Sequence, residues 1–133
     1  MEIRKIRRND MQTNPMCSEF GGMVEYSTSE HVVGKWIDGS TIYEKTISIG
    51  ALPNNSVKST PHGISNLGYL ISANGVAQRN SPYRAHPIPY VNATSITDQI
   101  QVVVLEQYVT IYTSMDYSGF SNTYVTLRYT KSS

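Results

Sequence analysis

Side chains able to bind a polar ligand gather in two stretches of the sequence. The first, residues 80–90, contains Tyr83, Arg84 and His86 among three prolines. Tyrosine and histidine rings stack on a sugar or a peptide, and a guanidinium donates directional hydrogen bonds. Prolines reduce the entropy that a loop loses on binding. This stretch predicts a rigid recognition loop, although an ordered connecting loop or a frayed edge strand explains the same composition.

The second stretch, residues 114–121, is a polar loop that contains Asp116 and Tyr117. A carboxylate accepts hydrogen bonds, and a tyrosine ring offers a surface for stacking. The candidate ligand-binding residues are therefore Tyr83, Arg84, His86, Asp116 and Tyr117. Nothing in the sequence shows whether the two stretches meet in space.

No pattern in the chain points to catalysis or to a metal. The three histidines, His31, His62 and His86, lack a partner at metal-ligand spacing, and no acidic run resembles a calcium loop. The chain has no Gly-x-Ser-x-Gly and no phosphate-binding glycine loop. A glycosidase pair would need two scattered carboxylates to meet by folding. We expect a non-enzymatic protein without a metal or cofactor.

Composition excludes several partners. The formal net charge of +1 argues against a dedicated nucleic-acid binder. No run approaches the roughly 18 apolar residues that cross a membrane. The single cysteine, Cys17, excludes an intramolecular disulfide. Tyrosine is abundant, with ten Tyr against two Phe, which suits both strands and binding surfaces.

Turn signals divide the chain into many short strands. Residues 31–37 and 42–49 predict a hairpin around Asp38-Gly39, with Gly39 in a left-handed conformation. Asn74-Gly75 predicts a second tight turn. The further predicted strands are residues 57–60, 64–73, 76–79, 99–105, 108–113 and 123–129. This spacing predicts an all-β fold, an antiparallel β-sandwich that is jelly-roll-like, over residues 23–133. Residues 1–22 predict a short irregular or helical N-terminal arm before a Gly21-Gly22 hinge.

Some predicted strands are apolar on both faces. This holds for Tyr43–Ile49 and for Val102–Leu105, which is a continuous apolar run typical of a buried strand. One small sandwich does not cover such strands on both sides, so we expect another subunit to do so. Trp36 is predicted to lie in the core or in an interface.

Both ends of the predicted domain resemble a known family. The first contains Val33-Gly-Lys-Trp-Ile-Asp-Gly39, Tyr43-Glu-Lys-Thr46 and Leu52-Pro-Asn54, and the last is Tyr124-Val-Thr-Leu-Arg-Tyr-Thr-Lys131. These segments resemble the start and the close of the C-terminal β domain of bacteriophage tail-fibre and receptor-binding proteins. The resemblance covers about Glu25 to Lys131.

The resemblance implies a virion protein that recognises a host surface glycan or protein and assembles as a homotrimer. Residues 1–22 would attach it to other virion proteins, and the lack of a signal peptide implies assembly in the cytoplasm of the host bacterium. Two alternatives stay open. One is a structural virion component without a receptor site of its own, such as a head fibre, a decoration protein or a tail-assembly protein. The other is a glycan hydrolase or a free-standing carbohydrate-binding module.

Overall fold

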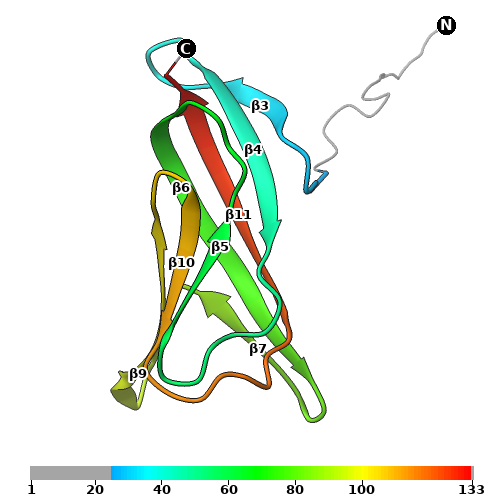
Figure 1. Ribbon diagram of the computed structural model, residues 1–133, viewed down its shortest axis with the longest axis vertical. Coiled ribbons are helices and arrows are strands. Elements are labelled where there is room, and N and C mark those ends of the chain that lie inside the picture. The colour runs from blue at the N-terminus through cyan, green and yellow to red at the C-terminus, as the bar shows by residue number, and fades with distance from the viewer. Residues whose placement is uncertain (1–24, 133) are drawn as a thin grey trace, which may run out of the picture.

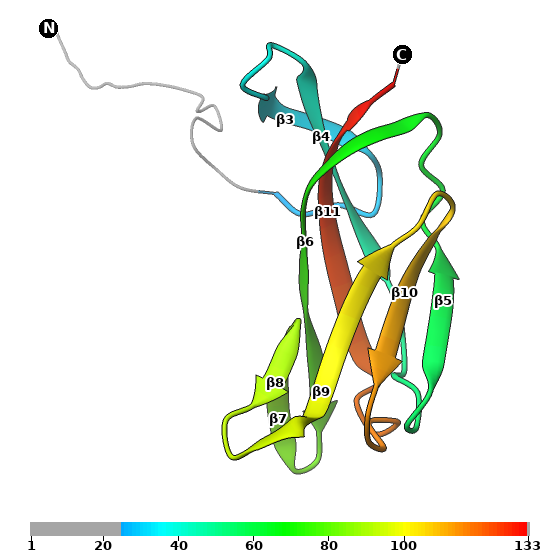
Figure 2. The same cartoon turned by 90° about the vertical axis from the view of Figure 1, so that its left-hand side faces the viewer.

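The protein is a sandwich of two antiparallel sheets (Figure 1, Figure 2). The computed structural model describes residues 25–132, so the predicted arm 1–22 and the predicted start of the domain at Met23 lie outside the described residues. The five-stranded sheet has the order β3 (His31–Lys35), β4 (Thr41–Ser48), β11 (Asn122–Lys131), β6 (Leu67–Asn80), β7 (Tyr83–Ile88). The four-stranded sheet has the order β5 (Val57–Pro61), β10 (Tyr108–Thr113), β9 (Ser95–Val104), β8 (Tyr90–Asn92). The predicted all-β sandwich is confirmed, and within residues 25–132 no helix is long and apolar enough to span a membrane.

The core lies between the sheets and follows strand alternation. Every second residue of β11, from Thr123 to Tyr129, faces the four-stranded sheet and is 0 % exposed. Val109 and Ile111 of β10 approach from the other side and are equally buried. The sequence predicted this face of residues 123–129, and the structure confirms it.

The first predicted hairpin is also confirmed. β3 and β4 pair antiparallel, and Gly39 in the connecting turn has φ +89°. The Gly39 amide donates to the Trp36 carbonyl at 2.9 Å, while Asp38 Oδ1 accepts from the Ser40 amide at 2.8 Å. An Asp side chain that binds the backbone amide two residues further on stabilises such a turn locally. The Asp-Gly pair alone was therefore sufficient to predict the turn.

The predicted turn at Asn74-Gly75 is wrong. β6 runs without a break through both residues, and residues 76–79 continue it instead of pairing back. A Cβ at Gly75 would lie 2.0 Å from the Tyr124 carbonyl oxygen of β11. The glycine is therefore a point of close approach between two central strands, where no side chain fits.

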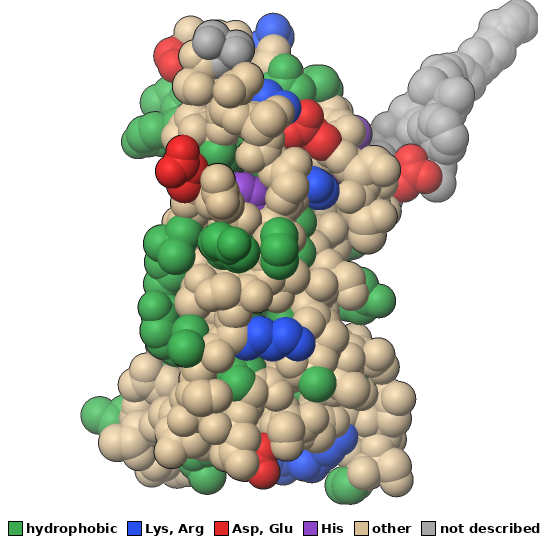
Figure 3. All heavy atoms as spheres, in the orientation of Figure 1, with side chains coloured by type: hydrophobic (Ala, Val, Ile, Leu, Met, Phe, Trp, Pro, Cys, Tyr) green, Lys and Arg blue, Asp and Glu red, His purple; other side chains and the backbone are tan. Residues whose placement is uncertain are grey.

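Several side chains expected to be buried are exposed. Within β9, Val102 and Val104 pack against the core, but Val103 is 41 % exposed, so the apolar run is half-buried. Trp36 is partly buried and contacts Tyr69, with ring centroids 6.0 Å apart. It does not belong to the buried core, and its place in an interface stays a prediction. Hydrophobic side chains gather along the left-hand side of the molecule, over β9 and β10 (Figure 3).

Two polar groups are buried with partners supplied by distant elements. The Glu44 carboxylate, 1 % exposed, lies 2.7 Å from Arg128 Nε and 3.3 Å from His31 Nε2. His62, also 1 % exposed, accepts from the Ile64 amide through Nδ1 and donates from Nε2 to the Leu105 carbonyl at 2.9 Å. These contacts tie β4 to β11, and the β5–β6 connection to the end of β9.

Candidate functional site

The residues predicted to form a recognition loop lie on a strand. Residues 83–88 form β7, the edge strand of the five-stranded sheet, and Pro87 is tolerated there because an edge strand needs donors on only one side. For these residues the loop interpretation is therefore wrong, and the alternative of an edge strand is confirmed. Strand alternation separates the candidates: Arg84 and His86 lie on the same side as the buried Ile88, toward the other sheet. Tyr83 lies on the outer side, 69 % exposed, and its hydroxyl donates to Gln78 at 3.1 Å.

The second candidate stretch is a loop, as predicted, and it closes one end of the sandwich. It connects β10 to β11 and folds inward, so that Tyr117 is 6 % exposed and Phe120 is 4 % exposed. The Phe120 amide donates to the Tyr117 carbonyl at 2.9 Å, which tightens the loop. Asp116 stays exposed and accepts from the Ser118 amide and hydroxyl at 3.0 and 2.6 Å. Tyr117 therefore packs into the end of the hydrophobic core.

The structure brings four of the five candidates together. A hollow of about 180 Å³, here called the end hollow, opens between the β6–β7 end of one sheet and the 114–121 loop. Arg84, His86, Asp116 and Tyr117 line it, and Tyr83 does not. Figure 3 shows basic and acidic side chains side by side at this lower end of the molecule. The other lining residues are Arg79, Tyr90, Asn92, Asp98, Met115 and Phe120.

Aromatic rings form one wall of the end hollow. The His86 ring lies 4.1 Å from the Tyr90 ring, 5.2 Å from Phe120 and 5.9 Å from Tyr117, centroid to centroid. Partial burial lowers the pKa of His86, and the neighbouring Arg84 and Arg79 lower it further against the opposing effect of a nearby carboxylate. The imidazole is therefore neutral at pH 7, and it adds a flat, uncharged face to the wall.

A partly buried chain of hydrogen bonds holds this wall in place. The Tyr117 hydroxyl donates to Asp98 Oδ1, and Asn92 Nδ2 donates to Asp98 Oδ2 at 3.2 Å. Burial, and then the bond to Asp98, raise the pKa of Tyr117 well above its usual value. Its hydroxyl stays protonated and remains a donor, so the wall keeps one arrangement.

Two arginines differ in how firmly they are held. Arg79 Nε donates to the Pro82 carbonyl at 3.1 Å, and its guanidinium carbon lies 5.2 Å from the centre of the Phe120 ring. No hydrogen bond or ion pair from residues 25–132 holds the exposed Arg84 guanidinium. The fork of donors on Arg84 is therefore available to hydroxyl, carboxylate or phosphate oxygens of a ligand.

Two carboxylates, Asp98 and Asp116, line the end hollow, and a glycosidase needs such a pair. Their hydrogen bonds, however, do not suit a general acid and a free base or nucleophile. Hydrogen bonds from Ser118 lower the pKa of Asp116, whereas a general acid needs a raised pKa. Both Asp98 oxygens already accept hydrogen bonds. Among residues 25–132, no three His, Cys, Asp or Glu side chains lie together as metal ligands.

Sequence reasoning missed the residues that support the candidates. Asp98 and Phe120 carry no local signal, because their role depends on elements that fold against them. Arg79 and Tyr90 adjoin the predicted loop, and interpreting residues 83–88 as a strand would have placed Arg84 and His86 on one side. Comparison of the chain with protein-family models, with curated proteins and with solved structures finds no match.

Proposed function

We propose that this protein is a non-enzymatic phage virion protein, a tail-fibre-like receptor-binding domain that recognises a host surface glycan. The observation that carries the proposal is the meeting of Arg84 and His86 with Asp116 and Tyr117 in the end hollow. An aromatic wall, an unpaired guanidinium and an exposed carboxylate match the ring faces and hydroxyl groups of a sugar. The sequence resemblance to tail-fibre domains supplies the virion setting.

The size of the end hollow limits what it takes. Its volume of about 180 Å³ is below the roughly 300–1,000 Å³ of sites that enclose a drug-sized ligand. It suits one terminal sugar ring, while the rest of the glycan stays outside. A single contact of this size is weak, so several copies acting together would supply the affinity.

The test is binding to an array of bacterial lipopolysaccharides and capsular polysaccharides. Arg84→Ala should weaken binding at least about tenfold, a change of about 1.4 kcal/mol. Lys35→Ala is the matched control, because Lys35 is an exposed cation on β3, far along the sheet from β7. Binding that Arg84→Ala leaves unchanged in a folded protein, or no binding to any polysaccharide, contradicts the proposal. Binding only to protease-sensitive cell surfaces points to a protein receptor instead.

The apolar outer face of the four-stranded sheet favours a second candidate function, a structural virion component. Its exposed hydrophobic side chains, each 41–51 % exposed, are Val57, Val103, Leu105, Tyr108 and Tyr112. Contiguous apolar surface of this kind marks an interface, and we propose that it packs in a homotrimer. Light scattering of the full chain at micromolar concentration should give three copies, and a strict monomer contradicts the assembly. Imaging the particle with a tagged copy separates a tail from a head position.

A further inference from the structure

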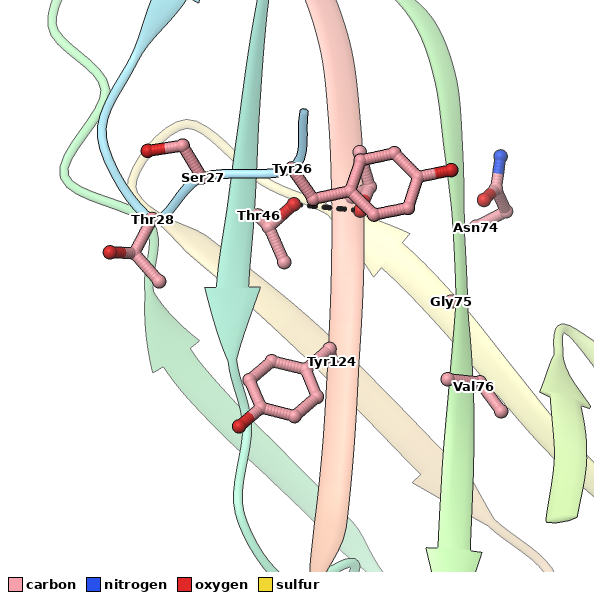
Figure 4. A pocket seen from close by; sticks show the side chains of 9 residues that line it. Tyr26, Ser27, Thr28, Thr46, Asn74, Gly75, Val76 and Tyr124 are labelled. Carbon is pink, nitrogen blue, oxygen red and sulfur yellow. Dashed lines mark hydrogen bonds between the residues drawn. The ribbon is translucent and has the colours of Figure 1, made fainter. Parts of the chain in front are cut away.

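A second concave surface lies on the outer face of the five-stranded sheet, away from the end hollow. The segment that precedes β3 passes over β4 toward β11 there and borders a groove of about 470 Å³ (Figure 4). This surface, here called the sheet groove, shares no lining residue with the end hollow. Its volume falls within the range of roughly 300–1,000 Å³ typical of ligand sites.

Two tyrosine rings border the sheet groove. Tyr124 stands on β11 and is 44 % exposed, and Tyr26 on the crossing segment is 69 % exposed. Figure 4 shows the two rings at separate positions along β11. No ring contact or hydrogen bond within residues 25–132 engages either side chain. Both rings therefore have faces on which a sugar can stack, and both hydroxyls are available.

The floor between the rings carries uncharged polar groups. The Thr46 and Thr126 hydroxyls lie 2.9 Å apart, so one donates to the other and one hydroxyl hydrogen is left for a ligand. Asn74 pairs in register with Thr126 and is exposed, and no described residue binds its amide. An amide and a hydroxyl next to each other both donate and accept, as sugar hydroxyl groups do.

Charge and backbone pairing restrict the ligand class. The residues that line the sheet groove include no Asp, Glu, His, Lys or Arg, unlike those of the end hollow, which include two arginines and two aspartates. Among residues 25–132, the lining of the sheet groove therefore offers no cationic side chain to an anionic ligand. β4, β11 and β6 are consecutive neighbours in the sheet, so β11 has no free edge and a peptide strand cannot add to it.

We propose that the sheet groove binds an uncharged oligosaccharide chain. Tyr26 and Tyr124 stack on sugar rings, and Asn74 with Thr126 binds their hydroxyl groups. The site is independent of the end hollow, so the protein holds a glycan at two places that differ in charge. The proposal therefore goes beyond the function assigned to the end hollow.

Calorimetric titration of the full chain tests this with neutral hexasaccharides of glucose, N-acetylglucosamine, mannose and galactose, and with a galacturonate hexasaccharide as the charged probe. At least one neutral probe should bind, and Tyr124→Ala should weaken it at least about tenfold. Tyr124→Phe should keep most of the affinity. Tyr83→Ala is the matched control, since Tyr83 is 69 % exposed at the start of β7, lines neither the sheet groove nor the end hollow, and should change nothing.

Several outcomes would overturn the proposal. These are no binding of any neutral probe at about 5 mM, equal binding of the galacturonate probe, or unchanged binding by Tyr124→Ala. Should Tyr124→Ala fail to fold, Asn74→Ala replaces it, and unchanged binding by that variant also overturns the proposal. Arg84→Ala should leave binding of the neutral probe intact, which separates a failure here from a failure at the end hollow.

Discussion

Replacing Gly75 with alanine should destabilise the sandwich strongly, although the glycine lies in a regular strand. The added Cβ would lie 2.0 Å from the Tyr124 carbonyl oxygen and 2.9 Å from the Val125 Cα. Both atoms belong to the backbone of β11, so no side-chain rotation relieves the overlap. β6 and β11 would have to move apart at the centre of the five-stranded sheet.

The cost follows from what that separation breaks. Overpacking in a well-packed region costs about 1–3 kcal/mol. Lengthening one ladder hydrogen bond on either side of the glycine adds about 1 kcal/mol each. We expect a loss of about 3–5 kcal/mol, which is a large part of the 5–15 kcal/mol that typically stabilises a domain. For a domain of this size the melting temperature falls by about 4 °C for each kcal/mol.

Gly34→Ala is the matched control, because Gly34 is also a strand glycine but has nothing within 4 Å of an added Cβ. It should change the free energy of unfolding by less than about 1 kcal/mol, in the stabilising direction. Urea denaturation of the full chain measures both variants. A loss at Gly75 below about 1 kcal/mol, equal to that at Gly34, would refute the close approach. A loss of about 1–2 kcal/mol, together with a similar loss for Asn74→Ala, would instead fit a left-handed turn glycine.

Three further predictions concern buried or partly buried polar groups. Arg128→Ala should cost about 2–3 kcal/mol, because it leaves the buried Glu44 carboxylate without its closest cation. In a Glu44→Gln background the same replacement should cost less, and a double-mutant cycle measured by urea denaturation tests this. His62→Phe should cost about 2–4 kcal/mol, because it leaves the Ile64 amide and the Leu105 carbonyl without their partner. A melting temperature equal to that of the unmodified protein would contradict this. The pKa of His86 lies below 6.5 in the folded protein, so near this pH the unfolded chain binds more protons at His86 than the folded protein does. The free energy of unfolding should therefore fall as the pH drops below about 6.5. His86→Phe should flatten this part of the stability profile between about pH 7 and about pH 5, and identical profiles would count against the assignment.

Local sequence patterns were sufficient wherever the residues that shape an element are neighbours in the chain. Asp38 and Gly39 stabilise their turn through bonds within five residues, so the first hairpin was predicted correctly. Strand alternation likewise predicted the buried face of β11, because the side-chain period of two is a property of the strand itself. The all-β class followed from many such short-range signals acting together.

Contacts between distant segments decided the rest. Asn74-Gly75 has the composition of a turn, but the backbone of β11 against it makes the same glycine a requirement of a continuous strand. Residues 83–88 contain a proline, which lacks a backbone N–H donor, and still form a strand. They can do so because β7 is the edge strand and has no neighbour on its outer side. Arg84 and Asp116 meet in the end hollow since the two sheets pack face to face and the 114–121 loop folds under them. No short-range pattern encodes that meeting, because it depends on how whole strands pair and stack.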